Sequence, residues 1–272
     1  MPFETRDLNP RIATEIRADK KTLLSGEYAK KIRELLEQRG VLVFPKIDFT
    51  DQEQIDFTET LGTFAPEMRG EKVYKVTLDK NENPGADYLK GSLYWHIDGT
   101  MNSVPILASL LSMRVLPSTG GGDTEFSNTY AAYDDLSDED KKTLEGLRVS
   151  HSAWNTIFYY DPECSIEMLR QMQAIGDREL PLVWTHRSGR KSLVLGATTD
   201  HIVGMPRDEA RALLDELLAQ ATVPERVCRH TWQVGDVVIW DNRGVLHRAC
   251  PYDPTSPRDM HRTTFAGDEP IQ

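Results

Sequence analysis

The chain lacks the cysteine pattern of a disulfide-stabilised or zinc-binding protein. Its 272 residues include Cys164, Cys228 and Cys250, an odd number of thiols that lie far apart and form no Cys-x-x-Cys pair. Such a set is typical of reduced thiols in the cytoplasm. The first 20 residues carry charges throughout, unlike a signal peptide, and no apolar run approaches the roughly 18 residues that span a bilayer. We therefore expect a cytoplasmic protein without a membrane partner.

The chain also has fewer basic than acidic residues. Lys and Arg total 32 against 43 Asp and Glu, which gives a formal net charge of −11. Bulk electrostatics therefore disfavours binding to nucleic acid or to an anionic membrane surface. A small anionic ligand remains compatible with this charge, since a local basic pocket can lie within an acidic protein.

Strand-like and helix-like segments do not alternate regularly, which argues against a doubly wound sheet. The spacing of apolar residues predicts helices over residues 28–39, 50–61, 127–136 and 206–221. Apolar or β-branched runs predict strands over residues 41–44, 72–78, 104–115, 148–160 and 237–240. No repeat and no change of composition marks a domain boundary. We expect residues 1–272 to form a single domain, mainly β with flanking α-helices, built as a β-sandwich or jelly roll.

The stretch Tyr94-Trp95-His96-Ile97-Asp98 places an imidazole and a carboxylate two residues apart. Its aromatic start favours a strand, on which His96 and Asp98 would point to the same face and could hold one metal ion. His247 ends a later apolar run. Two histidines and one carboxylate form the facial triad of non-haem Fe(II) oxygenases. A structural zinc site and unrelated histidines are the alternatives at this point.

Further motifs follow in a fixed order along residues 40–267: Trp95-His-x-Asp98, Gly121-Gly-Asp-Thr-Glu125, Trp240-Asp-Asn-Arg243 with His247, and Arg258 with His261-Arg-Thr-Thr264. In this order and spacing the chain resembles the taurine / 2,4-dichlorophenoxyacetate dioxygenase family of Fe(II)- and 2-oxoglutarate-dependent enzymes. The resemblance implies the double-stranded β-helix (jelly roll) fold and a reaction that consumes O₂ and 2-oxoglutarate.

Carried over to this sequence, the resemblance implies that His96, Asp98 and His247 bind Fe(II). It also implies that Thr124 and Arg258 bind the distal carboxylate of 2-oxoglutarate, and the planar fork of an arginine suits a carboxylate. The carboxylate of Asp98 argues for oxygenation, because related halogenases lack it. Two rival interpretations remain: a related oxidase that desaturates a substrate or forms an isonitrile from an amino-acid derivative, and a jelly-roll protein that binds a small molecule without catalysis.

The substrate is expected to be a small organic anion, with Arg262 reaching its acidic group. Ser92 and Met101 depart from the residues usual at their positions, and residues 64–74 contain no histidine of the kind that contacts a sulfonate. These departures favour an aryloxyalkanoate-like carboxylate over taurine, and hydroxylation beside its ether oxygen would cleave the ether. One further basic residue is expected at the substrate, from among Arg69, Lys72 and Lys75. Similar proteins lead us to expect a homodimer or homotetramer.

Overall fold

The computed structural model describes residues 3–66 and 70–272. Its larger sheet has eight strands in the order β1-β2-β3-β14-β6-β16-β4, with β5 also paired to β16. Their bounds are β1 (Glu4–Asp7), β2 (Thr14–Arg17), β3 (Val41–Phe44), β4 (Phe64–Ala65), β5 (Tyr74–Val76), β6 (Ile106–Val115), β14 (Val237–Asp241) and β16 (Asp259–Ala266). Every residue of β14 is buried, because this strand runs antiparallel between β3 and β6 and is covered on both faces.

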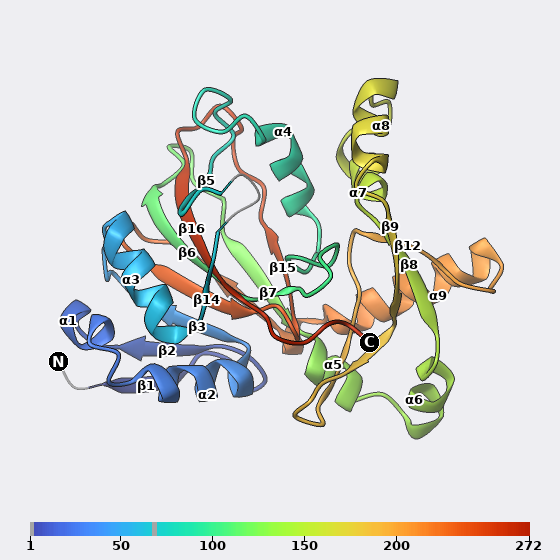
Figure 1. Ribbon diagram of the computed structural model, residues 1–272, viewed down its shortest axis with the longest axis horizontal. Helices are drawn as coiled ribbons and strands as arrows, with labels where there is room; N and C mark the ends of the chain where they lie inside the picture. The colour runs from blue at the N-terminus through green and yellow to red at the C-terminus, as the bar shows by residue number, and fades with distance from the viewer. Residues whose placement is uncertain (1–2, 67–69) are drawn as a thin grey trace.

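A smaller antiparallel sheet faces the larger one and has the order β13-β7-β15. It comprises β7 (Thr124–Asn128), β13 (Val227–His230) and β15 (Val245–Ala249). Phe126 and Val245 of this sheet pack against Trp240 and Met260 of the larger one in a continuous buried cluster. The two facing sheets are antiparallel apart from the parallel pair β2–β3. They confirm the predicted jelly roll, and Figure 1 shows them together in the left half of the molecule.

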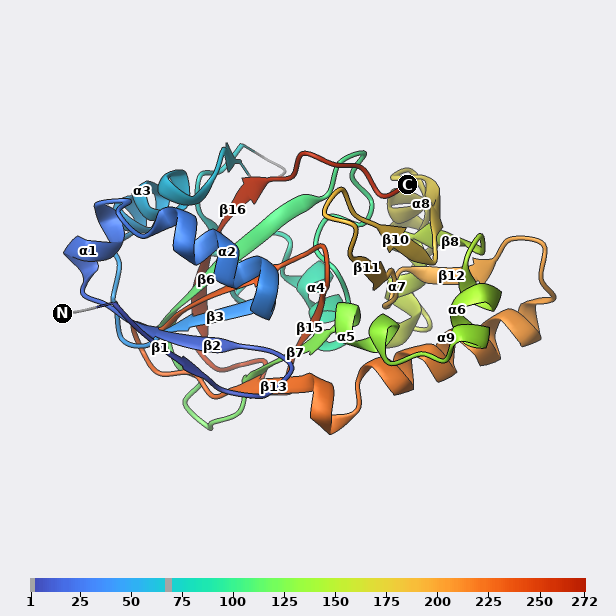
Figure 2. The same ribbon diagram turned by 90° about the horizontal axis from the view of Figure 1, so that it is seen from below.

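Helices cover the outer face of the larger sheet. They are α1 (Lys20–Leu24), α2 (Ala29–Arg39) and α3 (Asp51–Leu61). Thr50 starts α3 with a capping box, in which its hydroxyl accepts from the Glu53 amide while the Glu53 side chain accepts from the Thr50 amide. The buried side of these helices joins Phe44 and Phe265 of the sheet in one core. Figure 2 shows α2 and α3 lying over this outer face.

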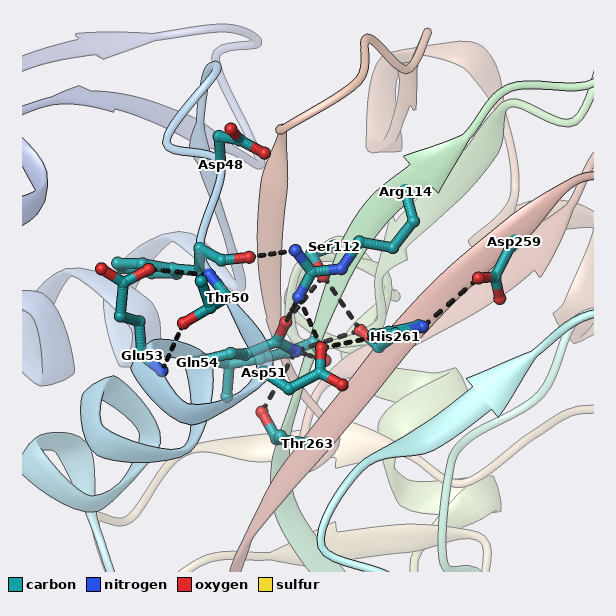
Figure 3. A network of polar contacts seen from close by, with 12 residues as sticks. Asp48, Thr50, Asp51, Glu53, Gln54, Ser112, Arg114, Asp259, His261 and Thr263 are labelled. Atoms are coloured by element: carbon teal, nitrogen blue, oxygen red, sulfur yellow. Dashed lines mark hydrogen bonds and ion pairs between the residues drawn. The ribbon is translucent and has the colours of Figure 1, made fainter.

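A polar network also ties α3 to the sheet (Figure 3). The Ser112 hydroxyl on β6 donates to Gln54 Oε1 at 2.6 Å, and Gln54 Nε2 donates to the His261 carbonyl on β16 at 3.0 Å. The His261 imidazole contacts Asp51 Oδ1 at 2.6 Å. These contacts anchor the outer face of β6 and β16, whose inner faces look into the sandwich.

A long insertion between β7 and β13 forms the right half of the molecule in Figure 1. It contains the sheet β12-β8-β9 and the hairpin β10-β11. The elements are α5 (Thr129–Asp134), α6 (Asp138–Leu144), β8 (Arg148–Ser152), α7 (Ala153–Tyr160), α8 (Ile166–Gln173), β9 (Asp177–Pro181), β10 (Val183–Thr185), β11 (Lys191–Leu193), β12 (Thr199–Ile202), α9 (Arg207–Ala221) and η2 (Pro224–Arg226). Leu214 and Leu217 of α9 share a buried cluster with Trp95, so the insertion packs against the segment before Asp98.

Most of these sequence predictions are confirmed within a few residues. They are the helices over residues 28–39, 50–61, 127–136 and 206–221 and the strands over residues 41–44, 72–78, 104–115 and 237–240. The helix over residues 127–136 is shorter than predicted, because β7 continues to Asn128, whose side chain then caps α5. The strand over residues 72–78 is likewise shorter, with only Tyr74–Val76 paired. One prediction is wrong in part: residues 148–160 are a strand only to Ser152, since the aromatic remainder forms α7. None of the helices in residues 3–66 and 70–272 has the length and apolar character that a bilayer crossing requires.

Candidate metal centre and cosubstrate site

His96 and Asp98 lie in a loop, and the predicted strand at this position is wrong. The chain first forms α4 (Ala86–Leu89) and the short 3-10 helix η1 (Lys90–Leu93), and then makes a single β-bridge between His96 and His247. The His96 amide donates to the His247 carbonyl at 3.1 Å, and the His247 amide donates to the His96 carbonyl at 3.0 Å. This bridge joins residues distant in sequence and leaves the two imidazole centroids 4.1 Å apart.

Asp98 completes a cluster with the two histidines. One ligand atom from each of His96, Asp98 and His247 lies within 4.8 Å of the others. The Nε2 atoms of the two histidines each lie 3.8 Å from a different oxygen of Asp98. The structure thus brings together the three residues that the sequence nominated as metal ligands.

The hydrogen bonds and charges of these side chains suit a divalent metal. His96 Nδ1 lies 2.8 Å from the Tyr94 carbonyl, which can only accept, so Nδ1 donates there and Nε2 is the nitrogen that faces Asp98. Burial lowers the pKa of His247 to about 3, which keeps this imidazole neutral. Burial alone would raise the pKa of Asp98, but Arg262 and the hydrogen bond from Ser109 contribute to holding that pKa below its usual range. Two imidazoles and one carboxylate fit the donor set of non-haem Fe(II).

Side chains around the cluster fix the orientation of its members. The Ser109 hydroxyl donates to Asp98 Oδ2 at 2.7 Å, and Asn242 Nδ2 donates to Ser109 Oγ at 3.2 Å. The Trp240 ring centroid lies 4.7 Å from that of His247. Gly196, at φ +121°, approaches so closely that an added Cβ would lie 2.7 Å from the Trp95 carbonyl oxygen. The sequence analysis did not identify Ser109, because its contact with Asp98 depends on the fold alone.

Arg258 lies at the start of β16 as a buried cation. Its side chain donates from Nη2 to the Gly122 carbonyl at 3.1 Å and covers the Tyr252 ring at 4.7 Å. The residue is 3% exposed, and its Nε has no hydrogen-bond partner. Within residues 3–66 and 70–272, no carboxylate forms an ion pair with this guanidinium. Burial lowers the pKa of Arg258, as expected for a cation that still lacks an anionic partner.

Thr124 begins β7 and is buried, with 4% of its surface exposed. Its Oγ1 accepts a hydrogen bond from Trp232 Nε1 at 3.0 Å. Gly122, two residues earlier, must be small because an added Cβ would lie 2.9 Å from Arg258 Nε. The sequence analysis did not identify Trp232, which belongs to none of the recognised motifs.

Arg262 lies on the inner face of β16, beside the metal cluster. Its Nη1 is 3.5 Å from Asp98 Oδ1, and its guanidinium covers the Tyr74 ring at 5.2 Å. Tyr74 is also its partner across the strand pair β5–β16. A guanidinium that covers the Tyr74 ring therefore lies next to Asp98.

Four other residues nominated for the substrate lie in the described part of the chain. Lys75 pairs with His261, one position from Arg262, so its side chain leaves the opposite face of the strand and forms an ion pair with Glu82. This placement directs Lys75 away from Arg262, and its contact with the substrate stays a prediction. The Ser92 hydroxyl donates to the Leu89 carbonyl at 2.6 Å inside η1. Met101 is half-buried in the turn after Asp98, Lys72 is exposed, and Arg69 lies outside the described residues.

The remaining histidines all have partners outside the cluster. The pairs are His151 with Thr198, His186 with Glu269, His201 with Asp200, His230 with Asp236, and His261 with Asp51. None of these contacts involves His96, Asp98 or His247.

Comparison with known proteins adds to this geometry. The family model described as "Taurine catabolism dioxygenase TauD, TfdA family" matches residues 4–264. An alpha-ketoglutarate-dependent 2,4-dichlorophenoxyacetate dioxygenase of Burkholderia sp. is 38% identical over 90% of this chain and 87% of its own length. The enzyme of the same name from Cupriavidus pinatubonensis is 36% identical, over 98% of this chain and 99% of its own. The crystal structure of AAD-2 in complex with Mn(II) and N-oxalylglycine superposes with a TM-score of 0.85 at 33% identity and covers 100% of both chains. These matches show that the chain belongs to the TauD/TfdA family of dioxygenases.

Proposed function

We propose that the protein is an Fe(II)- and 2-oxoglutarate-dependent dioxygenase that hydroxylates a small aryloxyalkanoate-like carboxylate. The observation that carries this proposal is the pairing of two features. A His96–Asp98–His247 cluster offers three ligand atoms within 4.8 Å, and the buried guanidinium of Arg258 has no carboxylate partner among the described residues. The cluster suits Fe(II), and the buried guanidinium of Arg258 is suited to bind an anionic ligand.

Each group of residues has a separate task. His96, Asp98 and His247 hold the iron, which together with 2-oxoglutarate and O₂ supplies the oxidation of a substrate C–H bond and the release of succinate and CO₂. Arg258 and Thr124 bind the distal carboxylate of 2-oxoglutarate. Arg258 is suited to this task because a bound carboxylate relieves the cost of burying its charge without an ion pair. Trp240 and Ser109 keep His247 and Asp98 in place.

Arg262 and Tyr74 support the choice of substrate class. The guanidinium of Arg262 is suited to a carboxylate, and the Tyr74 ring that it covers gives an aryl group aromatic surface beside this cation. The names of the 2,4-dichlorophenoxyacetate dioxygenases among the relatives point to the same class. Hydroxylation of the carbon between the carboxylate and the ether oxygen gives a hemiacetal. Its collapse moves the hydroxyl proton to the ether oxygen and releases a phenol and a 2-oxo acid.

The test is aerobic incubation of the Fe(II)-loaded protein with 2-oxoglutarate and phenoxyacetate. We expect phenol, glyoxylate and succinate in equal amounts, with taurine giving much less succinate. With 2-phenoxypropionate as the substrate, a product that has lost two hydrogens would indicate desaturation instead. The absence of substrate-dependent succinate across a panel of aryloxy acids would contradict the proposed substrate class.

We further propose that residues 1–272 act as one domain in the cytoplasm and assemble as a homodimer or homotetramer. The packing of Trp95 into the same buried cluster as α9 supports a single domain, because the insertion and the metal-binding loop then share one core. Sedimentation of the purified protein would test the assembly state, and limited proteolysis would test whether the insertion separates from the sandwich.

A further inference from the structure

The hydrogen bond between Trp232 and Thr124 determines what the threonine hydroxyl can do. An indole N–H can only donate, so Thr124 Oγ1 must be the acceptor of the 3.0 Å contact. Both residues are buried, at 5% and 4% exposure, which shields this hydrogen bond from water. With the indole proton directed at its oxygen, the threonine can use its single proton only toward another group.

The indole itself is held firmly. The His230 ring meets Trp232 edge-on, with centroids 4.6 Å apart and an interplanar angle of 86°. His230 Nε2 lies 3.1 Å from Asp236 Oδ2, and this carboxylate accepts the backbone amides of Lys46 and Gln233, each at 2.9 Å. His230 is also the partner of Thr124 across the strands β13 and β7. The position of the indole is therefore fixed relative to the threonine that it contacts.

We propose that Trp232 is a positioning residue that makes Thr124 an obligate hydrogen-bond donor toward the distal carboxylate of 2-oxoglutarate. Trp232 thereby sets the preference of the site for a 2-oxo dicarboxylate over a 2-oxo monocarboxylate. This inference rests on the proposed function, which places that carboxylate at Arg258 and Thr124. Without the indole proton, the hydroxyl is free to rotate and to turn a lone pair toward the carboxylate, which weakens binding of the dicarboxylate alone.

The substitution Trp232→Phe tests the inference, because it keeps an aromatic ring and removes the N–H. We expect Mn(II)-loaded protein to bind 2-oxoglutarate about tenfold more weakly in calorimetry, the loss of about one hydrogen bond to a charged group. The KM for 2-oxoglutarate should rise by a similar factor while kcat changes less than about twofold. Binding of pyruvate, which lacks the second carboxylate, should be unchanged.

Trp154→Phe is the matched control. It removes an indole N–H that donates to Asp177 Oδ1 at 2.9 Å on the insertion, and it should leave binding of both oxo acids unchanged. Thr124→Val separates the two proposals. If Thr124→Val weakens 2-oxoglutarate binding and Trp232→Phe does not, the inference is overturned while the proposed function stands. If the unmodified protein binds no 2-oxoglutarate, the proposed function itself fails.

Two further measurements do not depend on the stability of Trp232→Phe. Thr124→Ser keeps the hydroxyl and should retain most of the dicarboxylate preference that Thr124→Val loses. In Zn(II)-loaded unmodified protein, the indole N–H resonance of Trp232 should shift when 2-oxoglutarate binds, whereas that of Trp154 should not. An unshifted Trp232 resonance, or a Thr124→Ser variant as impaired as Thr124→Val, would overturn the inference.

Discussion

Ser109 is the side chain whose removal tests the metal centre most selectively. Its hydroxyl donates to Asp98 Oδ2 at 2.7 Å and in turn accepts from Asn242 Nδ2 at 3.2 Å. Ser109→Ala deletes one charge-assisted hydrogen bond to the carboxylate and leaves the Asn242 amide without this acceptor. Asp98 then loses the contact that fixes the orientation of its Oδ2.

The size of the effect follows from these contacts. A hydrogen bond to a charged group contributes about 1.5–3 kcal/mol, and hydrogen-bond partners of metal ligands typically change metal affinity by about 10–100-fold. We expect Ser109→Ala to weaken Mn(II) or Fe(II) binding within this range. The free energy of unfolding of the metal-free protein should fall by about 1.5–3 kcal/mol, since the hydroxyl is replaced by a hydrogen atom and its hydrogen bond to the carboxylate is lost.

Anaerobic calorimetry with Mn(II) measures this change, and Ser112→Ala is the matched control. Ser112 lies on the same strand, is equally buried and also donates to a side chain, Gln54 Oε1 at 2.6 Å, but on the outer face of the sheet (Figure 3). Its substitution should leave metal affinity unchanged. Equal metal affinities for Ser109→Ala and the unmodified protein would refute the reasoning, as would an equal loss in Ser112→Ala.

Three other substitutions probe the site and its support. Arg258→Met should leave the metal-free protein as stable or more stable, because it removes a buried charge that forms an ion pair with no carboxylate in the described part of the chain. It should also abolish the rise in melting temperature on adding 2-oxoglutarate to Mn(II)-loaded protein, and a persisting rise would contradict this prediction. Gly196→Ala should lower the free energy of unfolding in urea by about 1–3 kcal/mol and weaken metal binding. The reason is that residue 196 has a φ of +121° and that the Cβ of an alanine there would clash with the Trp95 carbonyl oxygen. An unchanged metal affinity would contradict this prediction. Burial and Arg178 lower the pKa of His151 from 6.5 to about 3. Below pH 6.5 the imidazole is therefore protonated in the unfolded chain but stays neutral in the folded protein. Stability should therefore fall by about 2 kcal/mol between neutral pH and about pH 5, and His151→Gln should remove that part of the slope.

The sequence predicts which residues form the site better than it predicts the backbone conformation around them. The side-chain types of His96, Asp98 and His247 and the order of the motifs are enough to nominate these three residues as one cluster. The strand predicted around them is wrong, because a single bridge to His247 replaces a paired strand. Similarly, the residues of α7 favour a strand by their aromatic content, but packing of Ile157 in the core stabilises a helix there.

Residues that act through the fold could not be predicted in this way. Lys75 was nominated for its charge, but the face of a strand on which a side chain emerges depends on a register that only the pairing with β16 determines. Ser109 and Trp232 contact Asp98 and Thr124 across more than 10 residues of sequence separation, and neither belongs to a motif. Their roles follow from hydrogen bonds that exist only after the two sheets have come together.

Anaerobic addition of 2-oxoglutarate to the Fe(II)-loaded protein tests the central claim most directly. The account predicts a weak visible charge-transfer band that saturates at one 2-oxoglutarate per chain and is lost in Asp98→Ala. The same titration with Arg258→Met should require far more 2-oxoglutarate, because the anion loses its buried guanidinium partner. The account is contradicted if no band forms in the unmodified protein, or if Asp98→Ala gives the same band at the same concentrations of iron and 2-oxoglutarate.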